Sequence, residues 1–442
     1  MPRPDYIESL LQQVRDAGAE ADVMIDEQTS LSLKARSGEL EEQAVSDTRL
    51  IGLRLIKDQK VGLAFSEATD SEAITHLVEQ AVLNARFAKT DERQRILDNH
   101  AELHSDDALL CPPSDIGDAE RIELALQLER ACLEYPSIKS VPYNGVSERI
   151  SSRQLYSTGG LSAHSRQRVN ALYAYTLAEQ GETTAMAFEG QVARTGGQLA
   201  LEPVVKRACT EAERMLSGAP VESGHYSVIF ERNAQQSLFN AFALCLSAKS
   251  AMEGVNPWRD KLGQSVASPL LTLSDQPLLK DGFGYQLFDA EGVACQATAL
   301  VTEGRLDSLL HNSLTANYFN TSNTGHAQRS PKSALSVGAH QLHIAAGQAT
   351  QGDLTGGDYL ELTDLQGTHS GANALSGEFS FGASGYLCRN GERLRPVRGV
   401  TVAGNFYQML HRIEAVGDEP LWDWQRRSLM PLLRFGDVVV SG

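Results

Sequence analysis

A stretch of alternating residues near the C-terminal end constrains the fold of this chain most. Over residues 379–402, apolar side chains alternate with small or polar ones on both sides of the dipeptide Asn390-Gly391. An Asn-Gly pair suits a two-residue turn, because both central positions of that turn need a positive φ. The sequence therefore predicts a β-hairpin whose turn is Asn390-Gly391.

The length and composition are those of a globular protein with more than one domain. A chain of 442 residues exceeds one ordinary hydrophobic core, so two or three domains are expected. No apolar run approaches the roughly 20 residues of a membrane helix, and the first residues contain no signal-peptide core. The cytoplasm is the expected location, with no membrane partner.

The net charge of −17 is spread along the chain. Binding to nucleic acid without sequence preference depends on Lys and Arg that neutralise phosphates, so the acidity argues against a DNA or RNA partner. No CxxC pair occurs, and cysteines at irregular spacing in a cytoplasmic chain indicate reduced core residues. The six cysteines are Cys111, Cys132, Cys209, Cys245, Cys295 and Cys388.

The pattern of elements predicts an α+β fold with two domains. Residues 1–220 are expected to form an N-terminal α/β domain with two units, at about 1–90 and 118–220. The segment Ser217-Gly-Ala-Pro220 stops a helix and marks the domain boundary. Residues 221–442 carry many short strand-like runs separated by Gly, Asn and Asp turns, which indicates a β-rich C-terminal domain.

Residue patterns predict the helices and strands of each unit. Apolar residues at helical spacing predict a helix over 5–17, and Thr69-Asp-Ser-Glu72 resembles a capping box that opens a second helix. The polar segment 90–118 is interpreted as a linker or an exposed excursion. The expected strands of the first unit are 21–26, 29–35, 48–57 and 61–65. The second unit is expected to have helices near 119–134 and 199–216 around strands across 138–192. In the C-terminal domain, helices are expected near 233–252 and 404–413.

Several phrases in the second half of the chain follow one another in a recognisable order. They are Phe288-Asp-Ala-Glu-Gly-Val293, Asn323-Thr-Gly-His-Ala-Gln-Arg329 and the Gly-rich block at 367–410. Together they resemble the C-terminal domain of the PmbA/TldD family, which supplies the two subunits of a bacterial metalloprotease. The resemblance implies a peptidase-like C-terminal domain and peptide hydrolysis as the activity of the assembly.

In the catalytic subunit of that family a helix carries His-Glu-x-x-x-His, in which two His bind zinc, the Glu is the general base, and a Cys near the C-terminus completes the site. The equivalent helix here follows the strand at 228–230, and Asn240, Ala241 and Cys245 occupy the motif positions. No His lies between His225 and His311, and no Cys follows Cys388. Asn is a poor zinc ligand and Ala cannot accept a proton, so no catalytic or metal residue is assigned to this chain.

The resemblance therefore points to the PmbA (TldE-like) subunit, which lacks the metal motif. It implies that zinc is held by a TldD-like catalytic partner in a heterodimer, that a homodimer can form in isolation, and that the substrates are small unfolded peptides. The family is associated with maturation of a modified peptide antibiotic and with antitoxin turnover. Two alternatives stay open: a regulator of DNA-associated machinery, after the family's gyrase-modulator label, and an independent Cys or Ser hydrolase.

The loop around His326 is the candidate peptide-binding element. Thr324, Gly325, His326 and Arg329 could bind a peptide or carboxylate, and a hydrogen-bonded turn is the competing interpretation. His340 and His343 are expected on opposite faces of a strand, which argues against a metal pair. A Ser-His site at 369–370 lacks the G-x-S-x-G context that such chemistry uses.

Overall fold

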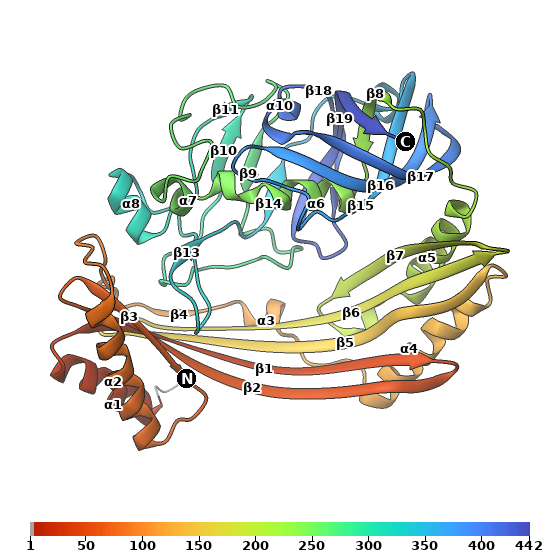
Figure 1. The fold of residues 1–442 in the computed structure, drawn as a ribbon. Helices are drawn as coiled ribbons and strands as arrows, with labels where there is room; N and C mark the ends of the chain where they lie inside the picture. Colours follow the sequence, from red (N-terminus) through yellow and green to blue (C-terminus); the bar gives the residue numbers. More distant parts are fainter. Residues whose placement is uncertain (1–3) are drawn as a thin grey trace.

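In the computed structural model, which describes residues 4–442, the first half of the chain builds one long sheet (Figure 1). Its order is β3-β2-β1-β5-β6, and both β4 and β7 pair with β6. All pairs are antiparallel except β4 with β6. Because β1 pairs with β5, the strands of both N-terminal units belong to a single sheet. The strands are β1 Glu20–Arg36, β2 Glu39–Lys57, β3 Lys60–Ser66, β4 Glu102–His104, β5 Ile138–Ser157, β6 Ser162–Gln180 and β7 Thr183–Ala193.

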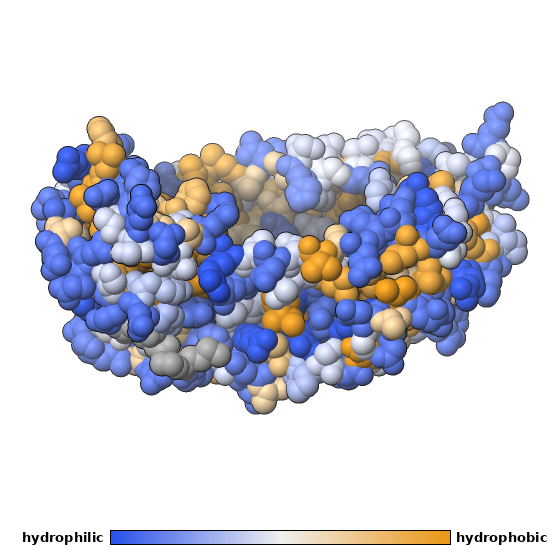
Figure 2. Space-filling view, turned by 90° about the horizontal axis from the view of Figure 1, so that it is seen from below, coloured by the Kyte–Doolittle hydropathy of each residue, from blue (hydrophilic) through white to orange (hydrophobic). Residues whose placement is uncertain are grey.

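Helices cover the two ends of this sheet and leave its middle open (Figure 1). Near one end, α1 (Asp5–Asp16) and α2 (Ser71–Phe87) close a core with β1, β2 and β3. At the other end, α4 (Asp118–Leu133) and α5 (Leu201–Met215) pack on β5, β6 and β7. In the uncovered middle, residues 41–49 of β2 are exposed and mostly polar. The face seen from below is accordingly mainly hydrophilic (Figure 2).

Long-range pairing lengthens the N-terminal strands beyond the sequence prediction. The runs at 21–26 and 29–35 form one strand, β1, because β2 and β5 pair with it on both sides. The predicted strand at 48–57 begins earlier, at Glu39. The helix expected after Thr69 begins at Ser71, with the Asp70 carboxylate accepting from the Ala73 amide at 3.0 Å.

The polar segment interpreted as a linker is partly structured. It supplies β4, which pairs with β6, and the short helix α3 (Asp107–Leu110). A 3₁₀ turn, η1 (Gly196–Gln198), precedes α5. Part of the backbone of 90–118 therefore completes the sheet in addition to connecting the two predicted units.

The C-terminal domain is built on a closed ring of five strands. The strand β8 (Gly224–Phe230) pairs in parallel with β15 and antiparallel with β19, which closes the order β15-β16-β17-β19 into a barrel. The other ring strands are β15 Asp358–Gln366, β16 Glu378–Arg389, β17 Glu392–Asn405 and β19 Ser428–Ser441. The predicted hairpin is present between β16 and β17, with Asn390 at φ 48° and Gly391 at φ 84°.

Shorter strands and helices surround this ring. The strands are β9 Leu273–Asp275, β10 Thr298–Thr302, β11 Arg305–Leu306, β12 Ala327–Gln328, β13 Ser336–Val337, β14 Leu342–Ile344 and β18 Ile413–Trp422. The helices are α8 Ser313–Phe319, α9 Gln351–Leu354 and α10 Phe406–Leu410, the last within the helix expected at 404–413. The α+β prediction is confirmed. No helix of residues 4–442 is long and apolar enough to cross a membrane.

The predicted helix at 233–252 is broken into three pieces. These are α6 (Arg232–Ala241), the 3₁₀ turn η2 (Ala243–Leu246) and α7 (Ala248–Met252). The Asn256 amide explains the break, because its Nδ2 lies 3.0 Å from the Cys245 carbonyl oxygen and 2.9 Å from that of Ser247. These carbonyls gain a side-chain donor instead of an intrahelical one, which stabilises the interrupted form.

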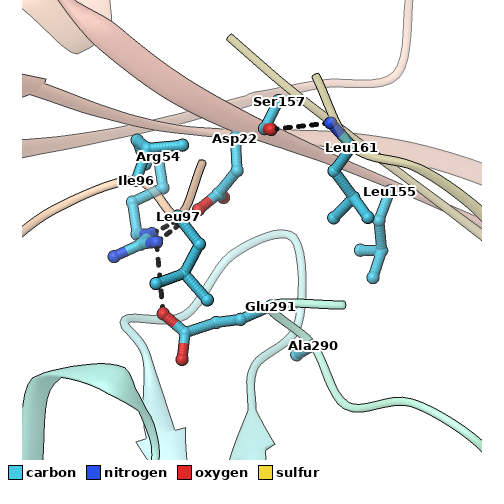
Figure 3. Close-up of a pocket in the computed structure, with 9 residues that line it drawn as sticks. All are labelled: Asp22, Arg54, Ile96, Leu97, Leu155, Ser157, Leu161, Ala290 and Glu291. Carbon is cyan, nitrogen blue, oxygen red and sulfur yellow. Dashed lines mark hydrogen bonds and ion pairs between the residues drawn. The ribbon is translucent and has the colours of Figure 1, made fainter. Parts of the chain in front are cut away.

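A buried cluster of four charges joins the sheet to the C-terminal domain, and Figure 3 shows three of them, Asp22, Arg54 and Glu291. Arg54 Nε lies 2.7 Å from Asp22 Oδ2, and an Arg54 amino group lies 3.7 Å from Glu291 Oε1. Arg329 pairs with the other oxygen of Asp22. We call Asp22, Arg54, Glu291 and Arg329 the junction cluster. Its two positive and two negative charges balance, as burial requires.

Candidate functional site

A large cavity lies between the central part of the sheet and the C-terminal domain. It has a volume of about 950 Å³, within the range of ligand pockets. One wall is formed by residues 186–189 of β7 and by the side of α5 that bears Arg207 and Glu211. The other wall comes from α6 and from residues 363–367 around the end of β15. We call this cavity the inter-domain groove.

The β7 wall presents a strand edge to the groove. Within residues 4–442, β7 pairs with β6 alone, so its second edge has no strand partner. Four consecutive residues of β7 line the groove, although successive side chains of a strand point to opposite faces. The groove therefore runs along the edge of the sheet and not only over one face. An extended peptide can pair with such an edge through its main chain.

Aromatic rings form an apolar wall that crosses from the sheet to the C-terminal domain. The Phe188 ring lies 4.8 Å from that of Tyr175 and 5.1 Å from that of Trp424, centroid to centroid. Tyr175 is 40% exposed and Met186 is 44% exposed. Apolar side chains of a bound peptide would find contact area here that does not depend on one particular sequence.

A separate set of ion pairs lies at the end of the groove where β7, α5 and α6 meet. The buried Glu189 carboxylate lies 3.0 Å from Arg207 Nε and 3.3 Å from an Arg232 amino group. Glu231 caps α6 by accepting from the Asn233 amide at 2.9 Å. Burial raises the pKa of the Glu231 carboxyl, with the neighbouring Glu189 adding to the shift. These pairs fix the two walls relative to each other.

Asn240, which the resemblance aligns with a zinc ligand, lies on the groove side of α6. Gln236 and Ser237 line the groove, and Asn240 follows them one turn later on the same helix face. Asn240 is exposed and is the last residue but one of α6, followed by the half-buried Ala241. The side chains at these positions supply neither an imidazole nor a base.

Cys245 lies apart from these two residues, beyond the helix break. It is 2% exposed within the barrel core, and burial raises the pKa of its thiol. A protonated, buried thiol is no zinc ligand. The set Asn240, Ala241 and Cys245 does not fit zinc, and within residues 4–442 no three His, Cys, Asp or Glu side chains are grouped so that they could hold a metal ion. Burial also raises the pKa of the Cys295 and Cys388 thiols, which gives them little nucleophilic character.

The loop predicted to bind peptide is buried. Thr324, Gly325, His326 and Arg329 are all covered by other parts of the chain. His326 is fully buried, with Nε2 2.9 Å from Asp275 Oδ2 and Nδ1 2.9 Å from the Thr324 hydroxyl. Arg329 belongs to the junction cluster. A peptide could reach these residues only if these contacts opened, and their role in peptide binding stays a prediction.

The residues that line the groove were not predicted from the sequence. A signal existed in α5, where Lys206, Arg207, Thr210, Glu211 and Arg214 recur at helical spacing on one polar side. All five line the groove. That signal alone could not distinguish a binding wall from an ordinary solvated helix face, because the opposite wall lies in distant parts of the sequence.

His311, which precedes α8, gives this domain a pH dependence. It is 6% exposed, and burial lowers the pKa of its imidazole to about 4. Since its pKa in an unfolded chain is about 6.5, the unfolded state binds more protons between these values, and stability falls as the pH drops through that window. We expect a loss of up to about 3 kcal/mol from this residue. Urea unfolding at pH 7 and pH 4.5 measures it.

The variant His311→Asn should reduce the change in the free energy of unfolding between pH 7 and pH 4.5, which is the slope of stability against pH. Burial also lowers the pKa values of His340 and His343, so these two residues would keep part of the pH dependence of stability. The exposed His76 on α2 offers the matched control, because His76→Asn should leave the slope unchanged. An unaltered slope in His311→Asn would contradict the assignment.

Comparison with known proteins places the whole chain in one family. Models of the PmbA/TldA metallopeptidase match it throughout: domain 1 at residues 21–85, the central domain at 111–216 and the C-terminal domain at 223–442. The chain is 27% identical over 413 residues to the metalloprotease PmbA homolog of Haemophilus influenzae. This match covers 91% of this chain and 88% of that protein.

Solved structures share the fold over the full length. A protein from Thermotoga maritima, described as a proposed modulator of a DNA gyrase, superposes with a TM-score of 0.89 at 23% identity and 99% coverage of both chains. TldE from Thermococcus kodakarensis superposes with a TM-score of 0.85 at 21% identity, covering 99% of this chain and 100% of that one. At these identities the likeness shows the fold alone. With the three family models, the conclusion is that this chain belongs to the PmbA/TldD family.

Proposed function

We propose that this chain is the PmbA (TldE-like) subunit of a TldD/TldE-type metalloprotease. In this role it cuts nothing by itself. It holds part of a small unfolded peptide in the inter-domain groove, while a TldD-like partner in the same cytoplasm supplies zinc and the general base. The observation that carries the proposal is the groove-facing end of α6, where Asn240 and Ala241 occupy the positions of a zinc ligand and a base.

The geometry of the groove supports binding of an unfolded peptide. The free edge of β7 offers main-chain donors and acceptors, which every peptide can pair with regardless of sequence. The ring of five barrel strands is closed, so a peptide cannot pair with an edge inside that ring. The β7 edge is therefore the strand edge that the groove offers.

The test is reconstitution with a partner chain that carries His-Glu-x-x-x-His and comes from the same cell. Each chain is purified alone, zinc is measured by mass spectrometry, and cleavage of a fluorogenic unfolded peptide is followed. We expect this chain alone to show neither stoichiometric zinc nor cleavage, and the equimolar mixture to elute as one complex that cleaves. Stoichiometric zinc with peptidase activity in this chain alone would overturn the proposal.

The groove itself is tested within the active complex. Phe188→Ala removes the ring that joins Tyr175 to Trp424, and we expect the KM for the peptide to rise by about tenfold, since stacked aromatic contacts of this kind contribute about 1 kcal/mol or more. Phe65→Ala, which removes an exposed ring on β3 far from the groove, is the matched control. Equal KM values for both variants would argue against the groove as the peptide site.

A further inference from the structure

A second cavity adjoins the inter-domain groove and is lined by arginines. Its volume is about 310 Å³, and it lies between the end of α5 and the start of β17. Arg214, Arg393 and Arg395 line it, together with the Ser217 and Tyr386 side chains. Arg214 and Arg393 also line the inter-domain groove, so the two cavities are adjacent. We call this second cavity the arginine pocket.

Two of the three arginines in this pocket, Arg214 and Arg395, form no ion pair within residues 4–442, whereas Arg393 is paired with Glu361 and lies 3.9 Å from Glu211. Arg393 forms a bidentate ion pair with Glu361, in which two guanidinium nitrogens each lie 2.8 Å from a carboxylate oxygen. Arg395 instead donates to the Ala219 and Pro220 carbonyl oxygens, at 3.0 and 3.1 Å. Arg214 is exposed, and its guanidinium has no hydrogen bond or ion pair within the described residues. In a chain with a net charge of −17, this local excess of cations is unusual.

Arg398 adds a further uncompensated charge beside the pocket. It donates to the Gly218 carbonyl oxygen at 3.3 Å and to that of Thr184 at 2.6 Å. No carboxylate pairs with it in the part of the chain that the structure describes. Because Thr184 lies at the start of β7, this contact also fixes the pocket next to the N-terminal end of that strand.

The direction of β7 decides which end of a peptide reaches the pocket. A peptide that pairs antiparallel with the free edge of β7 runs opposite to it, so its C-terminus lies near Thr184. Antiparallel pairing is the slightly more stable arrangement. A guanidinium binds a carboxylate with matched geometry, and an unpaired one in a cavity offers its donors without first losing a partner.

We propose that the arginine pocket binds the C-terminal carboxylate of the peptide held along β7. This inference rests on the proposed peptide-binding function and adds an end-specific contact to it. Arg214 provides the free guanidinium, and Arg395 provides the second charge. The protein would thus favour peptides that carry a free C-terminus within reach of the groove.

Binding of labelled peptides to the complex tests this inference. A fluorescein-labelled unstructured peptide is made with a free C-terminal carboxylate and, separately, with a C-terminal amide, and anisotropy is recorded. We expect the free acid to bind about tenfold tighter, which is the size expected for hydrogen bonds to a charged group. Arg214→Gln should abolish the difference, and it disturbs no contact within the described residues. Arg15→Gln on α1, at the far end of the sheet, should retain it.

The outcomes separate the pocket from the groove. If acid and amide bind equally well and Phe188→Ala weakens both, the arginine pocket is overturned while the proposed function stands. If neither peptide binds, the proposed function itself fails. A third peptide, amidated but with Glu near its end, separates the two carboxylate sources: binding as tight as that of the free acid would overturn the assignment to the C-terminus.

Discussion

The variant Asp22→Asn is expected to lower the free energy of unfolding by about 3–5 kcal/mol, the range found when one member of a buried ion pair is removed. Asp22 is 9% exposed and contacts both arginines of the junction cluster. Without its charge, Arg54 keeps the carboxylate of Glu291 (Figure 3), and Arg329 loses its ion pair with Asp22. One buried positive charge is then left without a counter-ion, and the low polarity around it makes that costly.

Urea unfolding followed by tryptophan fluorescence and circular dichroism measures this effect. Asp47→Asn is the matched control, because Asp47 lies exposed on the neighbouring strand β2 and should change stability by less than about 0.5 kcal/mol. The double variant Asp22→Asn/Arg54→Met should recover part of the loss, since it removes the excess charge together with its partner. A change below about 1 kcal/mol in the single variant would mean that water reaches the junction cluster.

The elements that sequence reasoning placed well are those specified by neighbouring residues. The hairpin at Asn390-Gly391 is one, because alternation and a turn that needs positive φ are both local properties. The full length of β1 is not, since its polar middle is held by pairing with β2 and β5. The break after α6 depends on Asn256. Its side-chain amide donates hydrogen bonds to carbonyl oxygens that would accept from backbone amides in a continuous helix.

The assignment of Asn240, Ala241 and Cys245 to the zinc-motif positions rests on the sequence and stays a prediction. The structure adds that Cys245 is buried whereas Asn240 is exposed. The groove was not predictable, because Phe188 and Trp424 meet across the two domains from positions far apart in the chain. His326 seemed accessible within a polar loop, but Asp275 lies against it from β9.

Asp275 is the second residue whose removal should have a large effect. Its side chain is fully buried and accepts three hydrogen bonds: from the His340 amide at 2.8 Å, from the Gln341 amide at 2.9 Å, and from His326 Nε2 at 2.9 Å. Asp275→Ala leaves all three donors without an acceptor in the interior. Since each unsatisfied buried group costs about 1–3 kcal/mol, we expect a loss of about 3–5 kcal/mol in the free energy of unfolding.

Two further variants make this expectation specific to the buried hydrogen bonds. Asp275→Asn keeps an oxygen for the two amides and should lose less, about 1–2 kcal/mol, because only the contact with His326 is disturbed. Asp307→Ala, at an exposed aspartate after β11, should stay within about 0.5 kcal/mol of the parent chain.

The same variants decide the role of the loop that carries His326. If that loop only supports the fold, the KM of the complex for peptide, measured well below the unfolding temperature, should be unchanged in Asp275→Asn. A rise in KM at full folding would instead show that the Thr324–Arg329 loop takes part in peptide binding. Because Asp275 is one of the two side chains that hold the His326 ring in place, the stability loss and the KM together separate a structural role of this histidine from a role in recognition.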